Sequence, residues 1–236
     1  MRRPLTLLAL ACCLPVLLRA DGLSDLITNL KRLEAKEPVR LKIDEESTER
    51  EDGKDLHEQR SVVLEDGPAG FRVLQDSAGD AMKKANHGVK VGSGKAKGES
   101  SWRRQVRAHQ DLLEELDRAR LLEDRPDVLD GQPVRRLRLS LDLDLDDDAR
   151  KHVKQASHEA VLWLGPDGLP VAMQRDLEIR VRALAFIHVW TKINSWNRYK
   201  RVQDRLISTE ARDTVEGKAM GRPFSAKEIT LCAVQP

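Results

Sequence analysis

The chain has 236 residues, which is enough for one large domain or two small ones. Hydrophobic residues make up 40% of it and charged residues 34%, which is typical of a soluble globular protein with a strongly polar surface. The net charge of +2 includes three arginines in the first 20 residues and falls to −1 without them, so charge gives no reason to expect a nucleic-acid partner.

The first 20 residues have the pattern of an export signal. A basic pair precedes an apolar run from Leu5 to Leu18, and Ala20 ends the segment before Asp21. The run is shorter than the about 20 residues that a membrane span needs, so we expect no transmembrane helix in the mature chain. We predict a signal peptide at 1–20 and a periplasmic or otherwise exported protein, with lipid anchoring at Cys12 as the alternative.

Export also determines what the cysteines can do. Cys12 and Cys13 are lost with the signal peptide, which leaves Cys232 as the single thiol of the mature chain. We therefore expect no internal disulfide. Cys232 is expected to be a buried packing residue and not a nucleophile.

The first part of the mature chain changes its hydrophobic period near Pro38. Residues 23–35 are predicted to form an amphipathic helix, because leucines recur at intervals of three and four. From Val39 apolar residues alternate with polar ones, and strands are expected around 39–44, 56–64 and from Phe71 onward. Short turns between these strands favour an antiparallel meander.

A break in the pattern follows. The segment at about 77–101 is rich in glycine, lysine and serine, and we predict a flexible loop. A flap over a pocket and a basic contact with lipid headgroups are the alternatives. Helical spacing returns from Trp102 to about Glu123, and Pro126 is expected to bound this second amphipathic helix.

The segment "RRLRLSLDLDLDDD" at 135–148 has a leucine at every second position. A calcium loop would need a glycine at its sixth position and a glutamate at its twelfth, and counting from Asp142 finds Asp147 and Val153 instead. A strand with one apolar face explains the pattern, because side chains alternate between the two faces of a strand. The leucines of that face are Leu137, Leu139, Leu141, Leu143 and Leu145.

The last third of the chain continues in strands. Gly165–Gly168 has strong turn chemistry between two apolar runs and predicts a hairpin. Apolar residues then alternate from Leu177 to Val189, which predicts one very long, curved strand. Two more strands are expected at 202–209 and 227–234.

This order of elements predicts an α+β fold. We expect one domain at 21–236, with a curved antiparallel sheet, an incomplete β-barrel, and two amphipathic helices covering its concave face. The helices would cover the leucine-rich side of the sheet.

The segment "VLWLGPDGLPVAMQRDLEIR" at 161–180, preceded by a signal peptide and an amphipathic helix, resembles the bacterial periplasmic lipoprotein-carrier proteins of the LolA and LolB type. Those proteins often have a tryptophan strand, a turn and a Leu-Pro strand, which here would be Trp163, the Gly165–Gly168 turn and Leu169-Pro170. The resemblance implies an incomplete β-barrel with helices in its mouth that holds acyl chains.

Two kinds of function are consistent with this sequence. The first is a non-enzymatic envelope protein that binds a lipid or acyl chain in its curved apolar sheet. The second is a structural or protein-interaction module of the envelope with a filled core and no small ligand. Candidate ligand-lining residues are Leu137, Leu139, Leu141, Leu143, Leu145, Trp163, Ile179 and Val181.

An enzyme is not expected, because the sequence lacks the nucleophile-elbow, zinc-protease and phosphate-loop motifs. Five of the six histidines lie in polar surroundings and are expected at the surface, whereas His188 lies in an apolar run and is expected to be a structural group. We predict no cofactor and no metal. His152 and His158 are six residues apart, which does not place them on a common helical face.

Overall fold

The computed structural model describes residues 21–51, 54–77, 99–143, 147–183 and 187–236. The predicted signal peptide and most of the predicted loop at 77–101 lie outside these ranges, as does Leu145. The end of that loop prediction is wrong, because Glu99–Ser101 already belongs to a helix.

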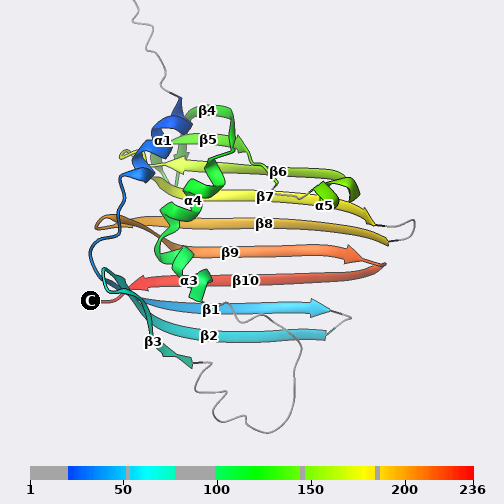
Figure 1. Cartoon of the computed structure of the whole chain (residues 1–236), viewed down its shortest axis with the longest axis horizontal. Coiled ribbons are helices and arrows are strands. Elements are labelled where there is room, and N and C mark those ends of the chain that lie inside the picture. The colour runs from blue at the N-terminus through cyan, green and yellow to red at the C-terminus, as the bar shows by residue number, and fades with distance from the viewer. Residues whose placement is uncertain (1–20, 52–53, 78–98, 144–146, 184–186) are drawn as a thin grey trace, which may run out of the picture.

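The molecule is built on one open sheet of ten antiparallel strands (Figure 1). The order is β3-β2-β1-β10-β9-β8-β7-β6-β5-β4, so neighbouring strands are consecutive in the chain except where β1 meets β10. β3 and β4 form the two edges, and within the described residues they do not pair with each other. The strands are β1 (Val39–Glu51), β2 (Lys54–Gly67), β3 (Gly70–Asp76), β4 (Arg120–Leu129), β5 (Gln132–Ser140), β6 (Val153–Leu164), β7 (Pro170–Ala183), β8 (Ile187–Val202), β9 (Arg205–Ala219) and β10 (Arg222–Val234).

Three helices lie over one face of this sheet, at one end of its strands (Figure 1). They are α1 (Gly22–Lys31), α3 (Glu99–Val106) and α4 (Ala108–Leu116). A short helix, α5 (Asp147–His152), lies near the opposite end, beside β7. None of the described helices is both long and apolar enough to cross a membrane.

Leucines of the helices and of the sheet form the larger core. In α1, the Asp21 carboxylate accepts a hydrogen bond from the Leu23 backbone N–H and so caps the helix. The stripe that follows it points at the sheet, and Leu26 and Leu30 are fully buried. These helical residues pack against strand residues on β5, β6 and β7, which include Leu137, Leu139, Leu162 and Met173.

A second core lies under α3, toward the β1–β2 side of the sheet. Trp102 and Val106 of α3 pack on aliphatic residues of β1 and β2. Cys232 belongs to this cluster, and burial raises the pKa of its thiol to about 12. The predicted packing role of Cys232 is therefore confirmed.

The predicted helix at 102–123 is wrong in two respects. It is interrupted at Arg107, whose guanidinium reaches the buried Asp66 carboxylate of β2 at 2.7 and 2.8 Å. It also ends at Leu116, and the residues from Arg120 onward form the edge strand β4. Pro126 lies inside β4, where the missing N–H does no harm because an edge strand has one unpaired side.

The predicted long strand from Leu177 to Val189 is also wrong. The structure contains a hairpin, in which β7 pairs with β8 and Val181 lies opposite Val189. Ala183 pairs with Ile187, so three residues separate the two strands. Because this number is odd, the odd-numbered residues of β7 and of β8 lie on the same face of the sheet. The alternation of apolar and polar residues therefore continues in phase from one strand into the next.

Other predicted elements are confirmed. Gly165–Gly168 connects β6 and β7, and the meander of β1, β2 and β3 is antiparallel. The leucine strand is shorter than predicted, since β5 ends at Ser140 and Leu143 lies beyond it.

Candidate functional site

The predicted ligand-lining residues do not form one site. Leu137 and Leu139 are fully buried and Leu141 is 6% exposed, all three within the helix-covered core. Leu143 is partly exposed beyond the end of β5. The three buried leucines fill space between the sheet and the helices, and ligand binding by Leu143 and Leu145 stays a prediction.

Trp163 lies on the opposite face of the sheet, because it follows the buried Leu162 on β6. Its indole N–H donates a hydrogen bond to the Asp127 carboxylate at 3.1 Å. Its ring contacts that of Trp196 at a centroid distance of 5.4 Å. Hydrogen bonds from the Val128 backbone and from this indole lower the pKa of Asp127.

Ile179 and Val181 belong to an extended set of apolar residues on the face that bears the helices. Strand pairing aligns this set in three rows across the middle of the sheet. The first row is Leu177, Ile193, Val215 and Ala226. The second is Ile179, Thr191, Gly217 and Phe224, in which Thr191 is the one polar residue. The third is Val181, Val189 and Ala219, and the charged Arg222 follows on β10. We call these eleven residues, without Arg222, the apolar surface.

The apolar surface lies beyond the reach of the three covering helices. Figure 1 shows α1, α3 and α4 over one end of the strands, whereas the other halves of β7 to β10 extend past them. Of the described helices, only α5 lies at its rim, where Val153 follows α5 and pairs with Val181. Apart from the buried Gly217, every residue of the surface is partly exposed.

Gly217 leaves room for the ring of Phe224, which is the one aromatic residue of the apolar surface. A Cβ at this position would collide with the ring of Phe224 and would lie 2.7 Å from the Trp190 carbonyl oxygen. The ring of Phe224 therefore lies over the backbone of β9. Only glycine leaves room for this arrangement.

A polar pocket separates the helix-covered core from the apolar surface. It has a volume of about 180 Å³ and lies between α3 and α4 on one side and β7, β8 and β9 on the other. Its polar and charged walls include Asp111, Glu115, Arg175, Asn197, Tyr199 and Asp213. A polar layer thus lies between two apolar regions of one face.

Arg175 is the central cation of the polar pocket. Its guanidinium donates to the Glu115 carboxylate at 3.1 Å, which joins β7 to α4. Burial alone would lower the pKa of Arg175, but the charge and hydrogen bond of Glu115, together with the charges of Tyr199 and Asp213, outweigh burial and raise the pKa. Burial also raises the pKa of Tyr199, whose hydroxyl lies 3.7 Å from the Met173 sulfur.

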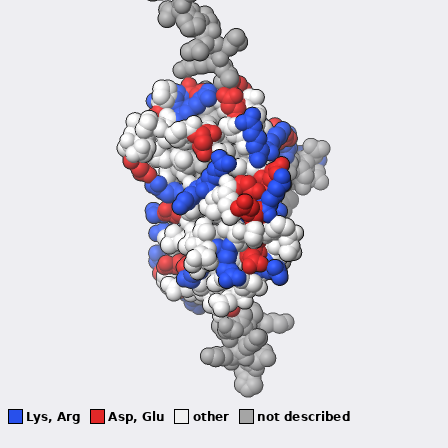
Figure 2. Space-filling view, turned by 90° about the vertical axis from the view of Figure 1, so that its left-hand side faces the viewer, with Lys and Arg blue, Asp and Glu red and all other residues white. Residues whose placement is uncertain are grey.

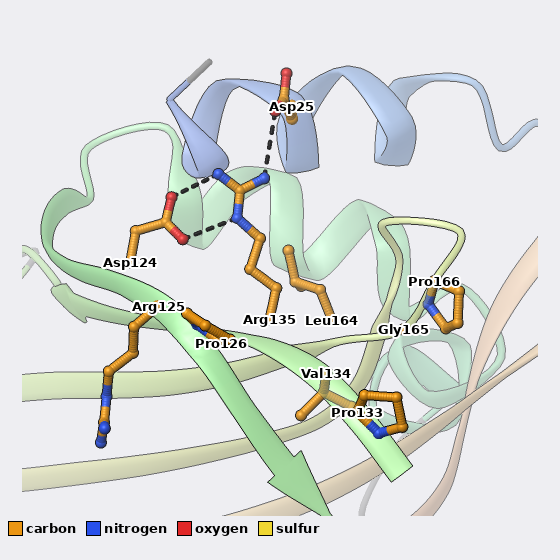
Figure 3. A pocket seen from close by; sticks show the side chains of 10 residues that line it. All are labelled: Asp25, Asp124, Arg125, Pro126, Pro133, Val134, Arg135, Leu164, Gly165 and Pro166. Atoms are coloured by element: carbon orange, nitrogen blue, oxygen red, sulfur yellow. Dashed lines mark hydrogen bonds and ion pairs between the residues drawn. The ribbon is translucent and has the colours of Figure 1, made fainter. Parts of the chain in front are cut away.

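A wide recess, of about 590 Å³, lies at the other edge of the sheet, where α1 meets β4 and β5 (Figure 3). Arg135 lies there between Asp124, at 2.6 and 2.8 Å, and Asp25, at 3.5 Å. A Cβ on Gly22 would come within 2.8 Å of atoms of this cluster. Because both carboxylates already engage Arg135, we interpret the recess as the joint that fixes α1 to the sheet edge.

The charged groups of the surface are mixed in sign. Figure 2 shows lysine and arginine side chains interspersed with aspartate and glutamate over the end of the molecule that lies to the left in Figure 1. Within the described ranges, no three His, Cys, Asp or Glu residues lie close enough together to hold a metal ion.

Two histidine predictions are wrong. His188 is exposed at the start of β8, where it pairs with Arg182, so it is not a buried structural group. His109 is only 2% exposed, because it lies on the same stripe of α4 as Leu112 and Leu116. Burial and the charges of nearby arginines lower the pKa of His109.

Sequence reasoning missed most of the apolar surface and the whole polar pocket. The residues of the pocket come from five elements, and their meeting depends on where α3 and α4 cross the sheet. The alternation in β7 gave a signal for Ile179 and Val181, but the matching residues of β9 and β10 lie in segments with several charged neighbours.

Comparisons with known proteins give similarity in structure only. No family model matches the chain, and no curated protein does. A DUF1329 family protein from Desulfovibrio piger aligns over 90% of both chains, with 13% identity and a TM-score of 0.39.

Two further structures align over 91% of this chain and 92% of their own. They are an outer membrane lipoprotein-sorting protein domain from Vibrio parahaemolyticus, with 13% identity and a TM-score of 0.34, and a LolA superfamily protein from Nitrosomonas europaea, with 8% identity and a TM-score of 0.32. The predicted resemblance to the lipoprotein-carrier group is thus confirmed as a resemblance. At this level of overlap the function has to be argued from the chain's own residues.

Proposed function

We propose that this chain is an exported, non-enzymatic envelope protein that binds the acyl chain of a lipid on its apolar surface. The observation that supports the proposal is the alignment of apolar residues from β7, β8, β9 and β10 in three adjoining rows that α1, α3 and α4 leave uncovered. A contiguous apolar area on an otherwise charged protein is typical of a binding surface.

The dimensions of the apolar surface fit a hydrocarbon chain. Four neighbouring strands span about 14 Å between the outer two, since strands lie about 4.8 Å apart. Ten methylenes lying on this surface with half of their area buried would gain about 4 kcal/mol, and complete burial would gain about 8 kcal/mol. These values correspond to dissociation constants between about 1 mM and about 1 μM.

An interaction module of the envelope is the second candidate function. Leu137 and Leu139, two of the predicted ligand-lining residues, are fully buried in the core under the helices. Their burial under the helices favours the second candidate, a protein with a filled core and no small ligand. If a ligand binds, we expect it on the apolar surface and not between the helices and the sheet.

A fluorescent fatty acid tests the proposal. Titration of the protein with a C16 probe should give saturable binding, and Ile193→Asp, in the first row of the apolar surface, should weaken it at least tenfold. Val161→Asp is the matched control, because Val161 is a partly exposed aliphatic residue of β6 on the opposite face.

Lipid extraction of protein purified from the periplasm of its own host gives the second readout. Co-purified acyl chains would support acyl-chain binding on the apolar surface. Equal loss of binding in the two variants, or the absence of saturable binding together with a stoichiometric protein partner, would favour the interaction module.

A further inference from the structure

The polar pocket has an excess of carboxylates. Asp111 and Glu115 of α4 and Asp213 of β9 contribute three acids to its wall, against the guanidinium groups of Arg104 and Arg175. Glu115 is bound to Arg175. Within the described residues, the carboxylates of Asp111 and Asp213 form no hydrogen bond or salt bridge, although the charges of Arg104 and Arg175 act on Asp111. The pocket can therefore accept a further positive charge.

Gln105 and Asn197 point to a ligand independently of the acids. The side-chain oxygen of Gln105, on the α3 wall of the polar pocket, is buried and has no hydrogen-bond partner among the described residues. A buried oxygen without a partner loses the free energy of hydration without compensation. Asn197 is 9% exposed and lines the β8 wall of the same pocket. A ligand that donates hydrogen bonds would satisfy the Gln105 oxygen and could also reach the Asn197 carbonyl oxygen.

The polar pocket adjoins the apolar surface along three adjacent strands. Arg175, Ser195 and Asp213 lie on the same face, each two positions from a member of the first apolar row. Those members are Leu177, Ile193 and Val215. One molecule with a polar end and a hydrocarbon chain could therefore occupy both regions.

We propose that the polar pocket binds a primary ammonium group, and that this group is the amino end of an amphiphile whose hydrocarbon chain lies on the apolar surface. An ammonium ion has three N–H donors and no acceptor, which suits the two carboxylates that form no salt bridge and the unpaired side-chain oxygen of Gln105. Burial raises the pKa of Asp111, and a cation beside it would oppose that effect. The second half of the proposal rests on the proposed function.

Tyr199 allows the pocket to be tested without a hydrocarbon chain. It is the single tyrosine of the chain and lines the pocket, so protein labelled with 3-fluorotyrosine gives one ¹⁹F resonance. We expect methylammonium to shift this resonance saturably, and acetate to leave it unchanged. Asp213→Asn should weaken the methylammonium response about tenfold or more.

Asp176→Asn is the matched control, since Asp176 lies on the opposite face and binds Gln174. It should leave the methylammonium response as in the unmodified protein. A saturable shift with acetate, or no shift with either ion, would overturn the assignment of the pocket.

Octylammonium and octanoate test the link to the apolar surface, because they differ only in the polar end. Octylammonium should bind at least tenfold more tightly, and Ile193→Asp should weaken it while the methylammonium shift persists. Equal affinity for the two amphiphiles would overturn the ammonium proposal but leave acyl binding intact. Binding of neither amphiphile, with the methylammonium shift retained, would support the pocket and overturn both its link to the apolar surface and the proposed function.

Discussion

Truncation of one core leucine and one surface isoleucine should separate packing from ligand binding. Leu139 is fully buried under the helices, and its partner on β6, Ala160, has no side chain that could fill a cavity. Leu139→Ala should therefore lower the free energy of unfolding by about 3 kcal/mol, within the range for buried leucines. Ile179 is already in partial contact with water, so Ile179→Ala should cost only about 1 kcal/mol.

Urea denaturation measures both free energies, and titration with the C16 fatty-acid probe measures the affinity. We expect Leu139→Ala to leave the affinity unchanged and Ile179→Ala to lower it. The reasoning would be refuted if Leu139→Ala cost less than about 1 kcal/mol and reduced the affinity more than Ile179→Ala does, because Leu139 would then line a cavity.

Three further predictions concern the frame of the molecule. Asp66 binds Arg107 and, at 2.6 Å, the fully buried Arg205, so Asp66→Ala should lower the free energy of unfolding by about 3–5 kcal/mol in urea denaturation. Glu159→Ala breaks an exposed pair with Arg138 and should lower it by at most about 1 kcal/mol. Equal losses in the two variants would contradict this prediction. Burial alone would raise the pKa of Asp66, but the hydrogen bonds and charges of the two arginines outweigh burial, and the pKa is lowered. The free energy of unfolding should therefore decrease as the pH falls below about 4, and it should decrease less steeply in Asp66→Asn than in the unmodified chain. Identical pH profiles would contradict a stabilising role of the Asp66 carboxylate. Gly217→Ala should displace the ring of Phe224 and destabilise the fold by about 1–3 kcal/mol in the same assay, and a neutral result would show that the backbone of β9 can move away.

Sequence patterns predicted an element best where a single feature, such as an alternation or a turn motif, determined it. The leucine alternation gave β5, and the Gly165–Gly168 turn gave the β6–β7 hairpin. The prediction lacks β4 because a proline such as Pro126 normally ends a helix and is rare inside a strand. Asp130-Gly131, whose residues both have positive φ, marks the tight turn into β5. The Asp-Gly pair was thus a usable signal for this hairpin.

The β7–β8 hairpin and the polar pocket were beyond local pattern for physical reasons. Residues 184–186 are Leu-Ala-Phe, which contain none of the glycine, proline or asparagine that mark turns, and the alternation continues in phase across them. The pocket depends on the break at Arg107 between α3 and α4, and that break reflects an interaction with Asp66 on a distant strand. Such an interaction has no trace in local sequence.

Crosslinking with a photoreactive fatty acid tests the central claim most directly. A diazirine-labelled C16 chain, bound to the purified protein, irradiated and mapped by tandem mass spectrometry, should modify residues of the apolar surface, in particular Ile179, Ile193, Val215 and Phe224. Crosslinks confined to the opposite face, for instance at Val161 or Trp163, or the absence of a saturable crosslink, would contradict the proposal that acyl chains lie on this half of the sheet.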